Sequence, residues 1–119
     1  MPNFSYLATT KIAAQFLEYT GSLQKLATFP SSTIQVLGAE RSLFRHLIKN
    51  TKPPKYGILF NHPLIKKLDK KMKGKAARSL AAKLSICAKL DYMNMKKGEK
   101  KFIADKLKKQ LEKRFGKWD

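Results

Sequence analysis

The segment from Gly74 to Asp91, GKAARSLAAKLSICAKLD, limits most strongly what this chain can fold into. At about 100° per residue its apolar side chains gather on one side of a helix, while Lys75, Arg78 and Lys89 fall roughly opposite. The apolar side is made of Ala77, Leu80, Ala81, Leu84, Cys87 and Ala88. This pattern predicts a helix that buries one face in a core and leaves a cationic face for a negatively charged partner.

Other segments also repeat apolar residues at helical spacing. Helices are expected over residues 7–20, 23–28, 39–49 and 99–115, with a further turn capped by Ser31 or Ser32 and a short helix that starts at His62-Pro63. Gly21 and Gly116 suit the positions just after helices, and Trp118 is expected to fold back onto the core. Residues 2–6 are expected to be an extended lead-in, 57–60 a strand fragment or buried extended chain, 66–75 a cationic connector, and 50–55 and 91–98 loops. The predicted fold class is all-α, a compact single domain of five to seven helices.

Charge points to the kind of partner. Lys and Arg number 26 against 8 Asp and Glu, a net charge of +18. Residues 1–50 carry five basic and two acidic side chains, whereas residues 51–119 carry 21 and six. So many positive charges repel one another unless a bound polyanion neutralises them, so nucleic acid is the favoured partner. Residues 51–119 are the favoured binding region. A lysine-rich proteome that decorates solvated helices is the alternative.

Cysteine content and hydropathy bear on the compartment. Cys87 is the single cysteine, so no internal disulfide is possible, and its place on the apolar face predicts a buried structural thiol. No apolar run approaches the roughly 18 residues of a membrane helix, and no signal peptide opens the sequence. A soluble, intracellular protein without a membrane partner is therefore expected.

The sequence offers little for catalysis. His46 and His62 are its only histidines, and no His and Cys spacing resembles a metal site. The acids are scattered, and no glycine-rich phosphate loop is present. We therefore expect no catalytic residues, no metal and no cofactor, with a nuclease that uses His62 as its base as the catalytic alternative.

The segment VLGAERSLFRHL, residues 36–47, could bind phosphate. Gly38 permits a sharp turn before a helix, which would leave the amides of Ala39, Glu40 and Arg41 unpaired at the helix start. Arg41 and Arg45 are four residues apart and would share a helix face. An ordinary capped helix with two solvated arginines explains the pattern equally well.

The segment PPKYGILFNHP, residues 53–63, ends in Asn61 and His62 beside a proline. Amide and imidazole groups in such a loop can contact base edges or stack on unpaired bases. A helix N-cap made by Asn61 or His62 carries equal weight.

Four segments in order, GAERSLFRHL, PPKYGILFNHPLI, KGKAARSLAAKLSICAKLDY and LEKRFGKWD, resemble the Nop domain. The opening residues 2–40 resemble the stretch that leads into it, so the resemblance covers essentially the whole chain. The family includes archaeal core proteins of box C/D ribonucleoproteins, their eukaryotic nucleolar relatives and a spliceosomal splicing factor, and the archaeal type is most similar.

The resemblance implies a module without catalysis that recognises a kink-turn RNA already holding its small ribosomal-protein-like partner. The family's Gly-Ala-Glu-Lys motif reads Gly38-Ala39-Glu40-Arg41 here, and its Ala-Leu-Phe-Arg motif reads Ser42-Leu43-Phe44-Arg45. In the family both motifs lie at the RNA. The residues expected to contact RNA are Gly38, Ala39, Glu40, Arg41, Phe44, Arg45, Asn61, His62, Lys75, Arg78 and Lys89.

Family members also carry an N-terminal domain that binds the methyltransferase fibrillarin, followed by a dimerising coiled coil. This chain has no matching segment, so residues 1–119 are interpreted as a Nop domain alone, and fibrillarin is expected to act only through the missing domain. A cytoplasmic location is expected in an archaeon and a nucleolar one in a eukaryote. A generic basic helical binder of DNA or RNA is one alternative function, and a Nop protein similar to the splicing factor is another.

Overall fold

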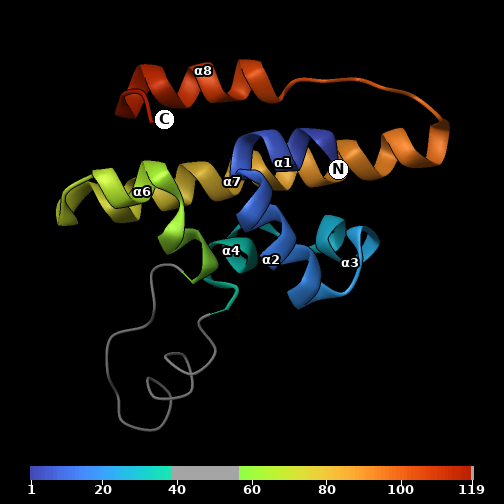
Figure 1. The fold of residues 1–119 in the computed structure, drawn as a ribbon, viewed down its shortest axis with the longest axis horizontal. Coiled ribbons are helices and arrows are strands. Elements are labelled where there is room, and N and C mark those ends of the chain that lie inside the picture. The colour runs from blue at the N-terminus through green and yellow to red at the C-terminus, as the bar shows by residue number, and fades with distance from the viewer. Residues whose placement is uncertain (39–56, 119) are drawn as a thin grey trace, which may run out of the picture.

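A computed structural model describes residues 1–38 and 57–118 (Figure 1). Every regular element in this described part is helical, as the sequence predicts. Helix α7, Lys70–Lys97, runs through the middle of the molecule, with α8 on one side and α2–α4 on the other. The expected helix 39–49 and loop 50–55 lie outside the described residues.

The chain opens with two helices, α1 (Pro2–Ala8) and α2 (Thr10–Thr20), that break at Thr9 with φ 80°. The predicted extended lead-in over residues 2–6 is therefore wrong. Proline suits the first turn of a helix, and the free amides of that turn are satisfied by Asp91, far away in the sequence. The predicted end is confirmed, because Gly21 adopts the left-handed conformation with φ 89°.

Helix α3, Leu23–Thr28, follows as predicted, and the Ser22 hydroxyl accepts the amide of Lys25 at 3.1 Å. Helix α4, Ser31–Val36, also forms, but its N-cap is Pro30 and no side chain caps it. The predicted serine cap is wrong because Ser31 already lies inside the first turn.

The apolar run after Gly57 is a 3-10 helix, η1 (Ile58–Asn61), and not a strand fragment or extended chain. The short helix predicted at His62-Pro63 is confirmed as α6, Pro63–Lys67. Residues 70–75 of the expected connector already belong to α7, whose first turn is capped by Asp69 accepting the Met72 amide at 3.1 Å.

Helix α7 is 28 residues long, or about 42 Å at 1.5 Å per residue. The side chains predicted for its buried face are all fully buried, namely Ala77, Leu80, Ala81, Leu84, Cys87 and Ala88. The predicted loop over residues 91–98 is wrong, since the helix continues to Gly98. Buried Asp91 and Asn94 stay helical because their side chains bond to α1 and to the Lys101 carbonyl.

The last helix, α8 (Ala104–Phe115), starts five residues later than predicted. Residues 99–103 connect α7 to α8, and Asn3 and Asn94 bond their backbone. Leu107, Leu111 and Phe115 are buried as expected. Trp118 folds back and packs edge-on against His62 with ring centroids 5.4 Å apart.

The core is apolar and continuous across α1, α2, α4, α6, α7 and α8. At its centre Phe4 and Phe16 meet edge to face, with ring centroids 5.5 Å apart. Among the described helices, none combines the length and hydropathy needed to cross a membrane.

Candidate nucleic-acid interface

Six of the residues predicted to contact RNA lie in the described part of the chain: Gly38, Asn61, His62, Lys75, Arg78 and Lys89. The other five, Ala39, Glu40, Arg41, Phe44 and Arg45, lie outside the described residues.

Gly38 makes the sharp turn that the sequence predicts, with φ 92°. The end of α4 lies beside the start of η1, where the Ile58 amide donates to the Leu37 carbonyl at 2.8 Å. A Cβ at position 38 would stand 2.6 Å from the Ile58 Cγ1 atom. Glycine is therefore required both by the backbone conformation and by the close approach of Ile58.

The pairing of these two segments brings Gly38 and Asn61 to the same hollow. Its volume is about 650 Å³, and Gln15, Glu18 and Tyr19 of α2 line its other wall. Asn61 also lines a second hollow of about 450 Å³ together with Lys11 and Lys66. The exposed Asn61 amide therefore lies between two polar depressions, one of which carries two cations.

His62 is buried and serves the fold. Its Nδ1 accepts the Leu64 amide at 3.1 Å, and its Nε2 lies 2.9 Å from the Leu7 carbonyl, to which it donates. Burial lowers the pKa of the imidazole, so the ring is neutral at pH 7. The prediction that His62 contacts a base is wrong, and the alternative of a catalytic base is disfavoured, because the ring is fully buried and both nitrogens are used. The N-cap interpretation is confirmed.

Helix α7 presents the cationic face that its periodicity predicts. Lys75 and Arg78 are exposed and lie one turn apart. Lys89 lies about 16 Å further along the helix. Its ammonium group donates to the Ser85 hydroxyl at 2.8 Å and to the Phe29 carbonyl at 3.3 Å, at the end of α3. Lys75 and Arg78 therefore form one cluster, whereas Lys89 bonds a backbone carbonyl at the C-terminal end of α3.

An exposed aromatic ring lies on η1, which the sequence did not indicate. Phe60 is 42% exposed, next to Asn61, and the Lys73 ammonium of α7 lies 5.1 Å from its ring centroid. Lys11 and Gln15 were also missed, because residues 1–50 carry little net charge. Only the packing of α2 against η1 brings them to Asn61, so no local signal could have found them.

The groups on this surface can bind a ligand through charge, hydrogen bonds and stacking. In the described part of the chain no group of three His, Cys, Asp or Glu side chains could hold a metal ion. Burial raises the pKa of the Cys87 thiol to about 12, which keeps it protonated. The exposed groups are ammonium, guanidinium, amide and aromatic groups, with the Glu18 carboxylate in the hollow beside Asn61. Together these features define a basic, all-α domain whose surface suits a polyanion.

Comparison with known proteins makes the class specific. The Nop family model, described as a snoRNA binding domain, fibrillarin, matches residues 1–117. The chain belongs to the Nop family.

Curated relatives agree with this assignment. An uncharacterized NOP5 family protein of Methanocaldococcus jannaschii is 47% identical over 113 residues, which cover 95% of this chain and 26% of the relative. Human nucleolar protein 56 is 37% identical over 114 residues, covering 96% of this chain and 19% of the relative. A chain in the crystal structure of a fibrillarin/Nop5p complex superimposes with a TM-score of 0.70 at 39% identity, covering 99% of this chain and 41% of that one. The chain thus spans about a quarter or less of the length of these two curated relatives.

Proposed function

We propose that this chain is a non-catalytic RNA–protein assembly module that recognises a box C/D-type kink-turn RNA together with its small ribosomal-protein-like partner. It would act in a guide-RNA 2′-O-methylation ribonucleoprotein, with fibrillarin bound by a domain outside this chain. The observation that carries the proposal is the match of residues 1–117 to a family model described as snoRNA binding. In an archaeon the assembly would be cytoplasmic, and in a eukaryote it would be nucleolar.

The exposed polar and cationic groups support RNA binding. Lys75 and Arg78 can contact phosphates, while Asn61 can reach a base edge from between its two hollows. The structural role of His62 argues against the alternative of a nuclease that uses this residue as its base. Lys89 can still screen phosphate charge at longer range.

Partner-dependent binding tests the proposal. The chain is titrated against a kink-turn RNA with and without the small partner, at two salt concentrations, beside a random RNA duplex. We expect tight binding only to the RNA that already carries the partner. Equal affinity for the random duplex would overturn the proposal and favour the generic basic binder.

Single substitutions locate the surface. Lys75→Gln and Lys106→Gln are a matched pair, since both remove one exposed lysine charge from a helix. Lys75→Gln should weaken the complex several-fold and reduce the salt slope by about one, whereas Lys106→Gln should change little. Arg45→Ala should cost about 1–3 kcal/mol if its contact is specific. Equal small losses at all three positions would show that only diffuse charge matters.

The generic basic binder is favoured by one observation. Exposed lysines also occur elsewhere, at Lys96, Lys97 and Lys100 and along α8. Such a binder would lose affinity equally with each of these charges, and the matched pair above separates the two functions.

A further inference from the structure

Tyr6 and Phe102 form an exposed aromatic pair where α1 meets the α7–α8 connector. Tyr6 is 45% exposed and Phe102 49% exposed. Their rings meet edge to face with centroids 5.2 Å apart and planes at 86°. Each ring therefore keeps open surface although it contacts the other, and the two residues come from opposite ends of the sequence.

The backbone on both sides of Phe102 is held in place. The Lys101 carbonyl accepts from Asn3 Nδ2 at 3.0 Å and from Asn94 Nδ2 at 2.8 Å. The Ile103 amide donates to Asn3 Oδ1 at 2.8 Å. Because these bonds fix the connector before any ligand arrives, little backbone order would be lost on binding.

Tyr6 is held by its hydroxyl. The Oη atom donates to Asp105 Oδ1 at 2.7 Å, and this bond raises the pKa of the phenol. The Lys108 ammonium lies 5.7 Å from the Tyr6 ring centroid. The ring is thus fixed on its polar edge, next to a cation.

The surroundings are positive on balance. We call the set Tyr6, Phe102, Lys100, Lys101, Lys108 and Lys109 the aromatic patch. Its neighbouring acids are paired, Asp105 with Lys109 at 3.1 Å and Glu99 with Lys101 at 3.4 Å. The exposed Lys100 and the other three lysines of the patch therefore offer ammonium groups to phosphates.

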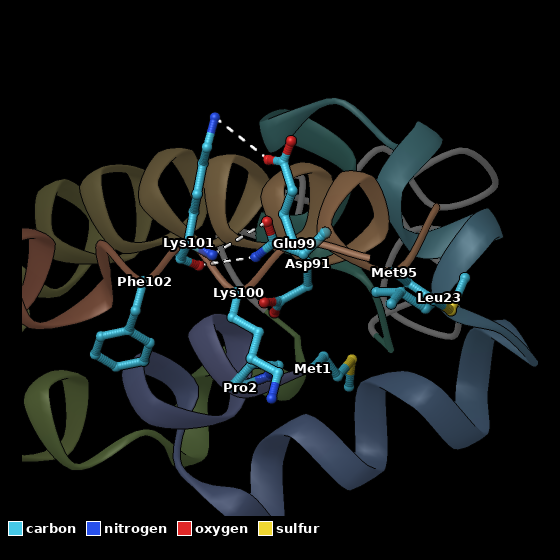
Figure 2. A pocket seen from close by; sticks show the side chains of 10 residues that line it. Met1, Pro2, Leu23, Asp91, Met95, Glu99, Lys100, Lys101 and Phe102 are labelled. Atoms are coloured by element: carbon cyan, nitrogen blue, oxygen red, sulfur yellow. Dashed lines mark hydrogen bonds and ion pairs between the residues drawn. The ribbon is translucent and has the colours of Figure 1, made fainter. Parts of the chain in front are cut away.

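A hollow of about 490 Å³ adjoins the patch (Figure 2), and Phe102, Leu23 and Met95 are among its walls. In Figure 2 the connector directs Lys101 toward Glu99, while Lys100 and Phe102 extend the other way. The Lys100 ammonium group and the Phe102 ring therefore both lie beside a mainly apolar cavity that is large enough for a planar base.

We propose that the aromatic patch binds unpaired RNA, with bases stacked on Phe102 and Tyr6 and phosphates on the neighbouring lysines. Stacking on aromatic side chains beside a positive groove is how proteins hold single strands without sequence preference. An acidic peptide would satisfy the lysines, but its carboxylates would leave the ring faces unused. The patch lies near α8, across α7 from α4 (Figure 1), so it is a second RNA contact that needs neither the kink-turn nor the small partner.

The test uses the full chain and a fluorescein-labelled uridine dodecamer, with fluorescence polarisation as the readout. Phe102→Leu and Tyr6→Leu remove a ring but keep an apolar side chain and the charge of the patch. Each should weaken binding about tenfold, as expected for the loss of one stacked base. Tyr6→Phe keeps the ring and should bind within twofold of the parent chain.

Ile86→Ala is the matched control, because it removes a side chain of similar exposure, 47%, from α7. It should bind the dodecamer as the parent does. A 12-base-pair RNA duplex should bind Phe102→Leu and the parent equally. The emission maximum of Trp118, the single tryptophan, checks that each variant is folded.

Unchanged dodecamer affinity in both leucine variants would overturn the proposal. Equal losses for the duplex, or for a labelled polyglutamate peptide, would also overturn it in favour of charge alone or of a protein partner. The two proposals can fail separately. If the leucine variants weaken dodecamer binding as expected but the parent chain does not prefer the kink-turn RNA that carries the small partner, only the proposed function is refuted.

Discussion

Replacing Asp91 with Asn should destabilise the protein far more than the same change at Asp69. Asp91 is 3% exposed, and its carboxylate accepts three hydrogen bonds at the first turn of α1. Oδ1 accepts the backbone amide of Asn3 at 3.0 Å and its Nδ2 at 2.9 Å, and Oδ2 accepts the Phe4 amide at 2.8 Å. An α7 carboxylate thereby caps α1, where the helix dipole also favours a negative charge.

The magnitude follows from these contacts. An asparagine can keep one accepting oxygen toward Asn3, but its NH₂ group then faces the Phe4 amide, and two donors meet. Leaving one buried N–H without a partner costs about 1–3 kcal/mol, and the other bonds lose their charge assistance. We expect Asp91→Asn to lower the free energy of unfolding by about 3 kcal/mol. Asp69 accepts only the exposed Met72 amide, and Asn caps a helix nearly as well as Asp, so Asp69→Asn should cost about 0.5 kcal/mol or less.

Urea denaturation at 25 °C, followed by helical circular dichroism, measures both variants against the parent chain. Equal losses for the two substitutions would refute the argument, because they would mean that the buried bonds of Asp91 add nothing beyond an ordinary cap.

Three further predictions concern single buried or strained groups. Burial lowers the pKa of His62 in the folded protein, so below about pH 6.5 the imidazole takes up a proton more readily in the unfolded chain. The melting temperature should therefore be constant above that pH and fall as the pH drops toward 5. An equally steep fall in His62→Gln would show that His62 is not the cause. Cys87, with its pKa raised to about 12, should react with a thiol reagent at pH 8 only after urea is added, and rapid labelling of the native protein would disprove its burial. Gly38→Ala should lower the free energy of unfolding by about 2 kcal/mol or more, because φ is 92° and the new Cβ would stand 2.6 Å from Ile58 Cγ1. Gly98→Ala should cost about half as much, because φ is 65° but no atom lies within 4 Å of the new Cβ. Equal urea midpoints for the two variants would show that crowding at Gly38 has no effect.

The part of the candidate interface that could be predicted is the part that lies on one helix. Lys75 and Arg78 share a face of α7 because of helical periodicity, and Gly38 was placed at a turn because glycine permits a sharp turn before a helix. Asn61 and His62 were indistinguishable by pattern, since both are polar residues before a proline. Only the tertiary structure shows that His62 is interior, because its Nε2 bonds the Leu7 carbonyl of α1.

Local sequence by itself determined the all-helical class, the buried face of α7 and the end of α2 at Gly21. Helical periodicity and the left-handed conformation of a terminal glycine are both properties of a few neighbouring residues. Tertiary structure alone decided the helix at residues 2–8 and the extension of α7 to Lys97. Both depend on Asp91 and Asn3, which meet across 88 positions of sequence, and no local pattern carries a contact of that range.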